Sequence, residues 1–110
     1  IVLDDTVDMV WVAQRTTAFF QHESCGKCSP CREGTFWMKK IYARIRSGEG
    51  SAKDVQTLNE VVRLINGKCF CPLGEFSLSA PKSTVEFFGD EYDDAVAGDD
   101  IPEPDYELAR

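Results

Sequence analysis

The stretch HESCGKCSPCREGT, residues 22–35, carries three cysteines at a regular spacing: Cys25, Cys28 and Cys31. Thiols spaced in this way can surround one compact group, and Gly26 lets the backbone pass close beneath it. A cubane iron–sulfur cluster binds four thiolates, commonly three from such a run and one from a distant position. The run therefore predicts three ligands of a [4Fe-4S] cluster.

A second pair of cysteines, Cys69 and Cys71, lies in the stretch KCFCPLG at residues 68–74. A four-ligand site leaves one of the two over, and the proline after Cys71 favours Cys71 as the fourth ligand. Cys69 is then expected to be a small buried apolar side chain. The odd total of five cysteines argues against a disulfide framework.

Zinc is the alternative occupant of these thiols. Structural zinc sites usually take two separated pairs of ligands, with roughly two to four residues between the members of a pair. Here a single residue separates Cys69 from Cys71, and a zinc ion would leave one cysteine of the first run unused. The pattern favours the iron–sulfur cluster, and a zinc-stabilised interaction module is the less favoured function.

Helical segments joined by short loops are predicted around the cysteines. Ser51 and Asp54 have the spacing of a capping box at the start of the third segment, and Gly67 is typical of a residue that ends a helix. These features predict an all-α fold, a small antiparallel four-helix bundle with the [4Fe-4S] cluster between the first helices and a C-terminal loop. The predicted helices cover about 6–22, 33–48, 51–65 and 81–92.

Apolar residues recur at helical spacing in each segment and define the face that each helix is expected to bury. Trp37 and the phenylalanines at this spacing are expected in the core. The predicted faces are Met9, Val12, Ala13, Thr16, Phe19 and Phe20; Trp37, Met38, Ile41, Tyr42 and Ile45; Val55, Leu58, Val61, Val62 and Ile65; and Val85, Phe88 and Tyr92.

Acidic residues gather toward the C-terminus of the chain. From Ser83 onward lie ten of the 19 acidic residues and one of the 12 basic residues, so the net charge of −7 belongs to this end. Residues 1–98 are predicted to form one helical domain and residues 99–110 an acidic flexible tail. The remainder has no stripe of Lys and Arg, which argues against nucleic-acid binding. No apolar run reaches the roughly 18 residues that insertion into a membrane as a helix requires.

The stretches HESCGKCSPCREGT and INGKCFCPLG resemble the C-terminal iron–sulfur domain of the NADH-binding flavoprotein subunit of respiratory complex I, NADH:quinone oxidoreductase. The resemblance extends over residues 1–94. It implies that Cys25, Cys28 and Cys31 are the first three ligands of a [4Fe-4S] cluster. It also implies that Cys71, in the element that reads F-C-x-L-G in the family, is the fourth ligand.

The resemblance implies an electron relay, in which FMN reduced by NADH gives single electrons to the cluster and these pass toward quinone. The chain starts without Met and holds no glycine-rich phosphate-binding loop, so the FMN and NADH sites are expected upstream, in a longer polypeptide. These 110 residues alone are therefore expected not to oxidise NADH. No residue of the chain is predicted to act as a catalytic acid, base or nucleophile.

The implied partners are other complex I subunits, notably the thioredoxin-like [2Fe-2S] subunit and the large multi-cluster iron–sulfur subunit. The implied location is the cytoplasmic side of the bacterial inner membrane, or the matrix side in a mitochondrion, as a peripheral part of the complex. Diaphorase subunits of NAD-dependent hydrogenases and formate dehydrogenases carry similar modules. Such a soluble enzyme is the alternative parent of the domain.

Overall fold

The computed structural model describes residues 1–96, which form helices and contain no strand. The prediction of an all-α fold is confirmed. Residues 97–110, which include the predicted tail 99–110, lie outside the described part of the chain. None of the helices described has the length and hydrophobicity needed to cross a membrane. The helices are α1 (Met9–Glu23), α2 (Ser29–Arg46), α3 (Ala52–Ile65), α4 (Leu73–Phe76), α5 (Ser79–Phe87) and α6 (Gly89–Val96).

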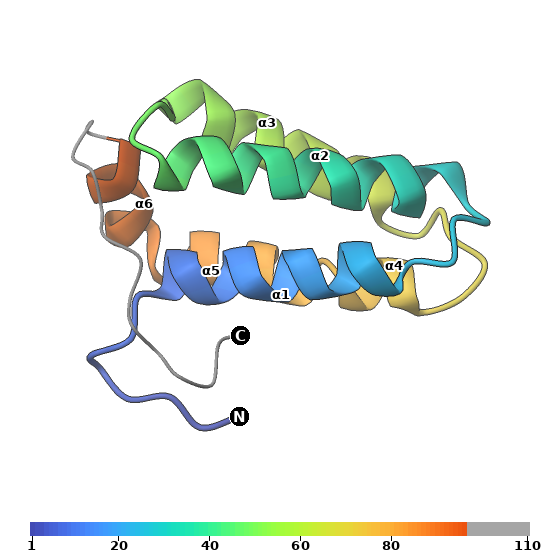
Figure 1. The fold of residues 1–110 in the computed structure, drawn as a ribbon, viewed down its shortest axis with the longest axis horizontal. Helices are drawn as coiled ribbons and strands as arrows, with labels where there is room; N and C mark the ends of the chain where they lie inside the picture. The colour runs from blue at the N-terminus through green and yellow to red at the C-terminus, as the bar shows by residue number, and fades with distance from the viewer. Residues whose placement is uncertain (97–110) are drawn as a thin grey trace.

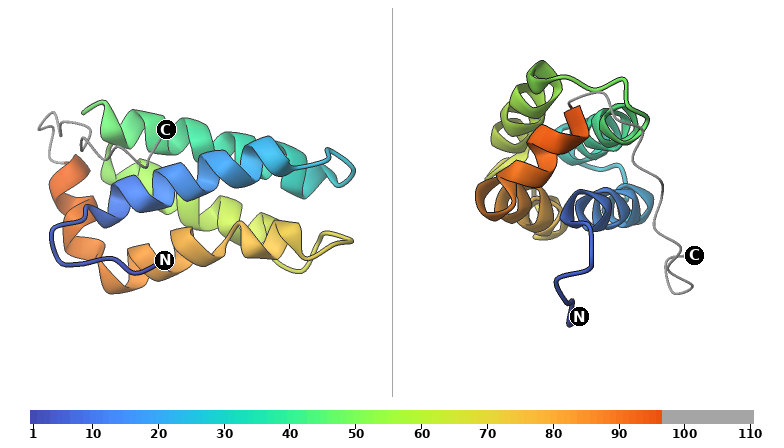
Figure 2. Two further views of the ribbon diagram at one scale, coloured as in Figure 1. Left: turned by 60° about the horizontal axis from the view of Figure 1, so that its bottom comes forward. Right: turned by 90° about the vertical axis from the view of Figure 1, so that its left-hand side faces the viewer.

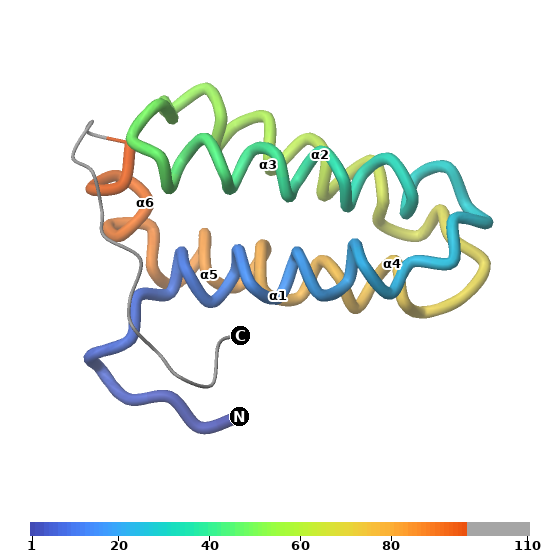
Figure 3. The backbone as a smooth tube through the Cα atoms, in the orientation of Figure 1, coloured from blue at the N-terminus to red at the C-terminus, as the bar shows by residue number. Residues whose placement is uncertain are grey.

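Helices α1, α2, α3 and α5 run alternately in opposite directions and form the predicted bundle (Figures 1 and 3). Helix α1 packs against α2 and α5, and α3 packs against the same two helices. The short helix α6 lies across the end of the bundle where α1 begins, as the end-on view in Figure 2 shows. The cysteine-bearing loops lie at the opposite end, so the bundle separates two ends with different structures.

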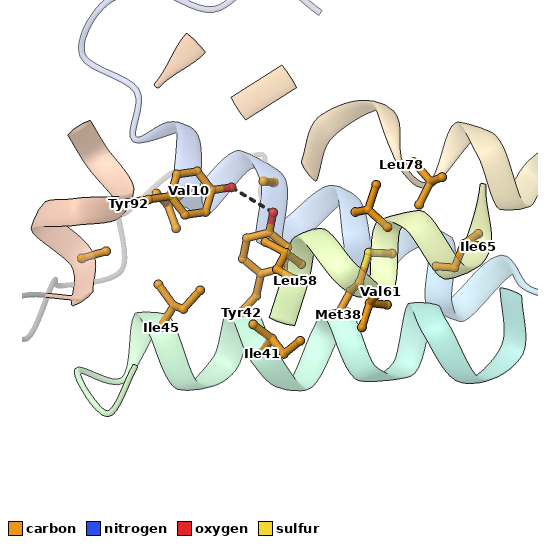
Figure 4. Packing of buried hydrophobic residues seen from close by; sticks show 13 residues of the cluster. Val10, Met38, Ile41, Tyr42, Ile45, Leu58, Val61, Ile65, Leu78 and Tyr92 are labelled. Carbon is orange, nitrogen blue, oxygen red and sulfur yellow. Dashed lines mark hydrogen bonds between the residues drawn. The ribbon is translucent and has the colours of Figure 1, made fainter. Parts of the chain in front are cut away.

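The core lies between these helices and combines apolar side chains with a small group of buried hydroxyls (Figure 4). The hydroxyls of Tyr42 and Tyr92 are 2.9 Å apart, and the Tyr92 hydroxyl is 2.8 Å from that of Thr84. Burial raises the pKa of Tyr42 well above its usual value, which keeps this hydroxyl protonated and able to donate. The buried apolar residues are Val10, Ala13, Met38, Ile41, Tyr42, Ile45, Leu58, Val61, Val62, Ile65, Leu78, Tyr92 and Ala95.

Helix α1 begins at Met9, later than the predicted residue 6, because Asp8 caps it. The Asp8 carboxylate accepts hydrogen bonds from two main-chain N–H groups of the first turn, at 2.8 and 3.1 Å, and pairs with Arg46 of α2. The Glu91 carboxylate of α6 accepts a third hydrogen bond, from the Met9 N–H at 2.6 Å. These contacts satisfy N–H groups that have no partner within the helix, and they join α1, α2 and α6.

The predicted buried face of α1 is correct in part. Ala13 of that face is buried and four of its other residues are partly buried, whereas Phe19 is 58% exposed. The fully buried stripe runs through Val10, Ala13 and Thr17, so it is turned away from Phe19. Trp37, which was also expected in the core, is 47% exposed on α2. The other residues predicted for the faces of α2 and α3 are buried or partly buried.

Helix α3 begins and ends where the sequence predicts. The Ser51 N–H donates to the Asp54 carboxylate at 2.8 Å, and the capping box is complete. At the other end Gly67 has a φ of 71°, a left-handed conformation that glycine adopts without strain. Both ends of this helix are therefore fixed by local sequence.

The predicted fourth helix, 81–92, is wrong as one continuous element, because the structure divides it between α5 and α6. Phe88 ends α5 with φ −128° and ψ 36°, outside the helical region, and its side chain is 41% exposed rather than buried as predicted. Helix α6 then turns across the end of the bundle. This change of direction brings Tyr92 into the core, where it was predicted to lie.

Gly34 of α2 lies where α2 and α3 pack together, and we expect Gly34→Ala to destabilise the fold. An alanine Cβ would lie 2.5 Å from Cδ1 of Ile65, a side chain with no exposed surface. Alanine normally stabilises a helix interior by about 1 kcal/mol relative to glycine. Overpacking a core costs about 1–3 kcal/mol, so after the gain in helix propensity the free energy of unfolding should fall by up to about 2 kcal/mol.

Chemical denaturation of the Gly34→Ala protein checks this expectation, and Gly89→Ala is the matched control. A Cβ at Gly89 would meet no atom within 4 Å. The control should change the free energy of unfolding by less than about 0.5 kcal/mol. A Gly34→Ala protein more stable than the wild type would contradict the close packing of Gly34 against Ile65.

Candidate metal centre

Two loops that are far apart in the sequence lie side by side at one end of the bundle (Figure 1). The first joins α1 to α2 and carries Cys25 and Cys28; the second joins α3 to α4 and carries Cys69 and Cys71. A direct contact connects them, because the main-chain N–H of Phe70 donates a hydrogen bond to the Cys28 sulfur at 3.3 Å. The fold therefore brings the run of three cysteines to the distant pair.

Helix α2 begins inside the cysteine run, with Cys28 as the residue before its first turn and Cys31 within that turn. The second helix was predicted to begin at about residue 33, and the structure begins it earlier, at Ser29. A proline suits the first turn because its missing N–H would have no partner within the helix. The positive end of the α2 dipole thus lies beside the thiols, where it would stabilise the negative charge of a bound cluster.

The loop that carries Cys25 is held by two polar contacts. Gly26 has a φ of 78°, and its carbonyl accepts a hydrogen bond from the Arg32 guanidinium at 2.7 Å. The Ser24 hydroxyl lies 3.3 Å from the Cys31 sulfur, within hydrogen-bond distance. Arg32 of α2 therefore holds this loop against the start of the helix.

The four predicted ligands differ in their exposure. Cys25 and Cys71 are exposed, Cys28 is half-buried and Cys31 is buried with 7% of its surface accessible. A cluster at this end of the bundle would thus have one side toward the protein and one toward the surface. The Phe70 N–H donates to the Cys28 sulfur, and the Ser24 hydroxyl lies within hydrogen-bond distance of the Cys31 sulfur; contacts of this kind orient the ligands of a metal centre and tune its potential.

Cys69 has different surroundings from Cys71. It is partly buried, packs against the apolar core, and its sulfur lies 3.9 Å from the main-chain carbonyl oxygen of Ile65. Burial, followed by the charges of Cys31 and Cys28, raises the pKa of the Cys69 thiol above its usual value. Cys69 was predicted to be a small buried side chain, and the structure places it partly buried against the core.

The chemistry of the donor set fits an iron–sulfur cluster. The five cysteines are free thiols, and soft thiolate ligands are those that iron–sulfur clusters select. Within residues 1–96, no three side chains of His, Cys, Asp or Glu are arranged to hold one metal ion. A cubane binds its four thiolates at four separate irons, so its ligands do not converge on one point.

Sequence reasoning missed two residues of this end of the molecule. Ser24 gave no signal, because its contact with a sulfur depends on how the loop folds. Gly74 is buried against Cys69, where an added Cβ would lie 2.5 Å from the sulfur. His22 is exposed in the last turn of α1.

Comparison with known proteins gives a consistent family. The model of the NADH-ubiquinone oxidoreductase-F iron-sulfur binding region matches residues 11–95. The NADH-quinone oxidoreductase F subunit of Mycobacterium tuberculosis is 46% identical over 101 residues, which are 92% of this chain and 23% of that protein. Its counterpart in Streptomyces coelicolor is 41% identical over 99 residues, 90% of this chain and 22% of that one. The chain thus spans less than a quarter of the length of these relatives.

A solved structure shares the fold. The NAD+-reducing [NiFe]-hydrogenase in its H2-reduced state superposes with a TM-score of 0.83 and 25% sequence identity. The match covers 97% of this chain and 19% of the hydrogenase chain. The bundle described above therefore recurs as a small part of a larger protein.

Proposed function

The chain belongs to the family of the NADH-ubiquinone oxidoreductase-F iron-sulfur binding region, and from this premise we propose that it relays single electrons within an NADH-oxidising flavoprotein. Its cofactor is a [4Fe-4S] cluster, which supplies one-electron oxidation and reduction when it is bound. The observation that carries the proposal is the meeting of the two cysteine loops through Phe70 and Cys28.

We propose Cys25, Cys28, Cys31 and Cys71 as the ligands of the cluster. The first three lie in one loop and the first turn of α2, and Cys71 lies in the loop that contacts them. Cys71 is exposed toward this end of the bundle, whereas the neighbouring Cys69 packs against the core. This difference supports Cys71 as the fourth ligand.

The role of the protein is to hold the four thiolates and to set the environment of their sulfurs. The N–H of Phe70 and the hydroxyl of Ser24 offer hydrogen bonds to sulfur, and such bonds raise the reduction potential of a cluster. The start of α2 adds the positive end of its dipole. These donors favour the more negative, reduced form of the centre, so they tune how readily it accepts an electron.

We further propose that the whole subunit takes electrons from NADH through FMN and passes them toward quinone. The NADH and FMN sites would lie in the larger part of the subunit, since this chain spans less than a quarter of its relatives. The partners would be the other subunits of the complex, notably the thioredoxin-like [2Fe-2S] subunit and the large multi-cluster subunit. The complex would hold this domain as a peripheral part on the cytoplasmic or matrix side of the membrane.

A soluble hydrogenase of the NAD-reducing class is the second candidate for the parent enzyme. The structural match to the NAD+-reducing [NiFe]-hydrogenase supports it. The two candidates differ in the enzyme that surrounds the domain, and both use this domain for one-electron transfer. Quinone reduction by the full-length protein in its complex, or hydrogen-dependent NAD+ reduction, distinguishes them.

Iron and acid-labile sulfide analysis of protein purified without air tests the cluster itself. We expect about four irons and about four sulfides per chain, with an EPR signal of a reduced cubane after dithionite treatment. This stoichiometry is that of one [4Fe-4S] cluster, in which each of the proposed thiolates binds one iron. Stoichiometric zinc without sulfide, in protein never exposed to air, would contradict the electron-relay function.

A further inference from the structure

Ser24 is the residue that ends α1, and its hydroxyl lies beside the most buried of the four proposed ligands. The main-chain N–H of Ser24 donates to the Phe20 carbonyl oxygen at 3.0 Å, so the last turn of α1 fixes its backbone. The hydroxyl oxygen is 3.3 Å from the Cys31 sulfur. Because Cys31 lies in the first turn of α2, this contact joins the end of one helix to the start of the next.

The surroundings of Ser24 determine which atom of this pair donates. The main-chain N–H of Gly26 donates to the Ser24 hydroxyl oxygen at 3.4 Å. A serine hydroxyl accepts through its lone pairs and donates through its O–H, so the O–H stays available for the sulfur. A cysteine that binds a metal does so as a thiolate, which has no proton to donate. In the cluster-loaded protein, Ser24 is therefore the donor and Cys31 the acceptor.

Gly26 holds the hydroxyl in this orientation, because both of its main-chain polar groups are bound. Its carbonyl accepts a hydrogen bond from the Arg32 guanidinium at 2.7 Å, while its N–H reaches Ser24. The φ of 78° at Gly26 permits this turn without strain. The loop thus presents the Ser24 O–H to the sulfur in a fixed position, before any cluster is reduced.

A hydrogen bond to a ligand sulfur acts more strongly on the reduced form of a cluster. Reduction adds one negative charge, and a more negative acceptor makes a stronger hydrogen bond. Cys31 is 7% exposed, so little water competes for its sulfur and the surrounding dielectric is low. Phe70 reaches the Cys28 sulfur through its main-chain N–H, whereas Ser24 reaches a ligand through its side chain. The Ser24 contact is therefore one that the choice of side chain can change.

We propose that Ser24 is a positioning residue of the iron–sulfur site, whose hydroxyl donates to the Cys31 sulfur and raises the reduction potential of the cluster. It binds no iron, and all four ligands remain when its hydroxyl is removed, so it acts on the potential and not on assembly. This inference rests on the proposed function and deepens it, because it assigns the tuning of the same cluster to one side chain and one ligand.

Redox titration followed by EPR tests the inference on the full-length protein and its Ser24→Ala variant. We expect the variant to hold about four irons. The equilibrium constant for its one-electron reduction should fall about two- to tenfold, which is the effect of one hydrogen bond. At about 59 mV for each tenfold change, the midpoint potential then becomes more negative by about 20–60 mV.

Two further variants serve as controls for the hydroxyl and for the site. Ser24→Thr keeps the hydroxyl, so its midpoint potential should return toward that of the wild type. Ser29→Ala removes an exposed hydroxyl from the same end of the bundle, one that accepts from Arg32 at 3.4 Å, and it should leave the potential close to that of the wild type.

An unchanged potential in Ser24→Ala would overturn the inference, and so would an equal shift in Ser24→Thr or in Ser29→Ala. Loss of iron from Ser24→Ala would overturn it too, because Ser24 would then be needed for assembly and not for the potential. Absence of iron and sulfide from the wild-type protein would instead overturn the proposed function and this inference with it.

Discussion

Replacement of Cys71 by serine is expected to abolish stable assembly of the [4Fe-4S] cluster, while the same replacement of Cys69 leaves the cluster in place. The two residues share one loop, but Cys71 is exposed at the end of the bundle that carries the other proposed ligands, and Cys69 packs against the core. A cubane held by three thiolates has an open iron that chelators and oxygen attack. The iron content of the Cys71→Ser protein should therefore fall from about four to below about one per chain.

The measurement is iron and sulfide analysis of both variants, produced in parallel and kept free of oxygen. Cys69→Ser is the matched control, because it makes the same chemical change two positions away. Cluster binding and folding are coupled in small metal-binding domains, so thermal unfolding of Cys71→Ser should also occur at a lower temperature. A full cluster in Cys71→Ser, together with its loss in Cys69→Ser, would exchange the roles proposed for the two cysteines.

Much of the candidate site could be predicted from the sequence, because cluster ligation depends on residue type and local spacing. The run of Cys25, Cys28 and Cys31 needs only a loop and a helix start to present three thiols. The surroundings of Cys69 could not be predicted in this way. They depend on how closely α4 approaches, which Gly74 permits, and on where α3 ends relative to α2. Such contacts between distant segments leave no periodic signal in the sequence.

The fold shows the same division between local and distant information. The ends of α3 were predicted correctly because Ser51, Asp54 and Gly67 act on their own neighbours. The face of α1 was predicted only in part, because its buried stripe through Val10, Ala13 and Thr17 depends on how the two neighbouring helices pack. Hydrophobic periodicity identifies a helix, but it identifies the buried side only where large apolar residues make the contact.

The division between α5 and α6 is the largest difference between prediction and structure, and a buried hydroxyl group explains it. A straight helix through Phe88 would continue along the bundle, beyond the core. Instead α6 lies across the end, where Tyr92 meets Tyr42 and Thr84. The bend exposes Phe88 and places a larger set of contacts around Tyr92, which is 1% exposed. Helix propensity at one position is small beside the burial of an aromatic ring.

Tyr92→Ala is accordingly expected to lower the free energy of unfolding by about 3–5 kcal/mol, as truncation of a buried aromatic ring does. The change removes the ring that fixes α6 to the bundle and leaves the hydroxyls of Tyr42 and Thr84 without their shared partner. Phe87→Ala is the matched control, because Phe87 ends α5 with 73% of its surface exposed, and its loss should cost less than about 0.5 kcal/mol.

Tyr92→Phe separates the two contributions, since it keeps the ring and removes only the hydroxyl. Leaving buried hydroxyls unpaired costs about 1–3 kcal/mol, so this variant should lie between Tyr92→Ala and the wild type. Denaturant unfolding of the wild type and the three variants, each loaded with the cluster and followed by circular dichroism, measures the differences in the free energy of unfolding. Equal stability of Tyr92→Ala and Phe87→Ala would show that α6 does not depend on Tyr92 for its place across the bundle. If Tyr92→Ala is the least stable protein and Tyr92→Phe lies between it and the wild type, the bend at Phe88 follows from burial of Tyr92. That side chain contacts Tyr42, fifty positions earlier in the sequence.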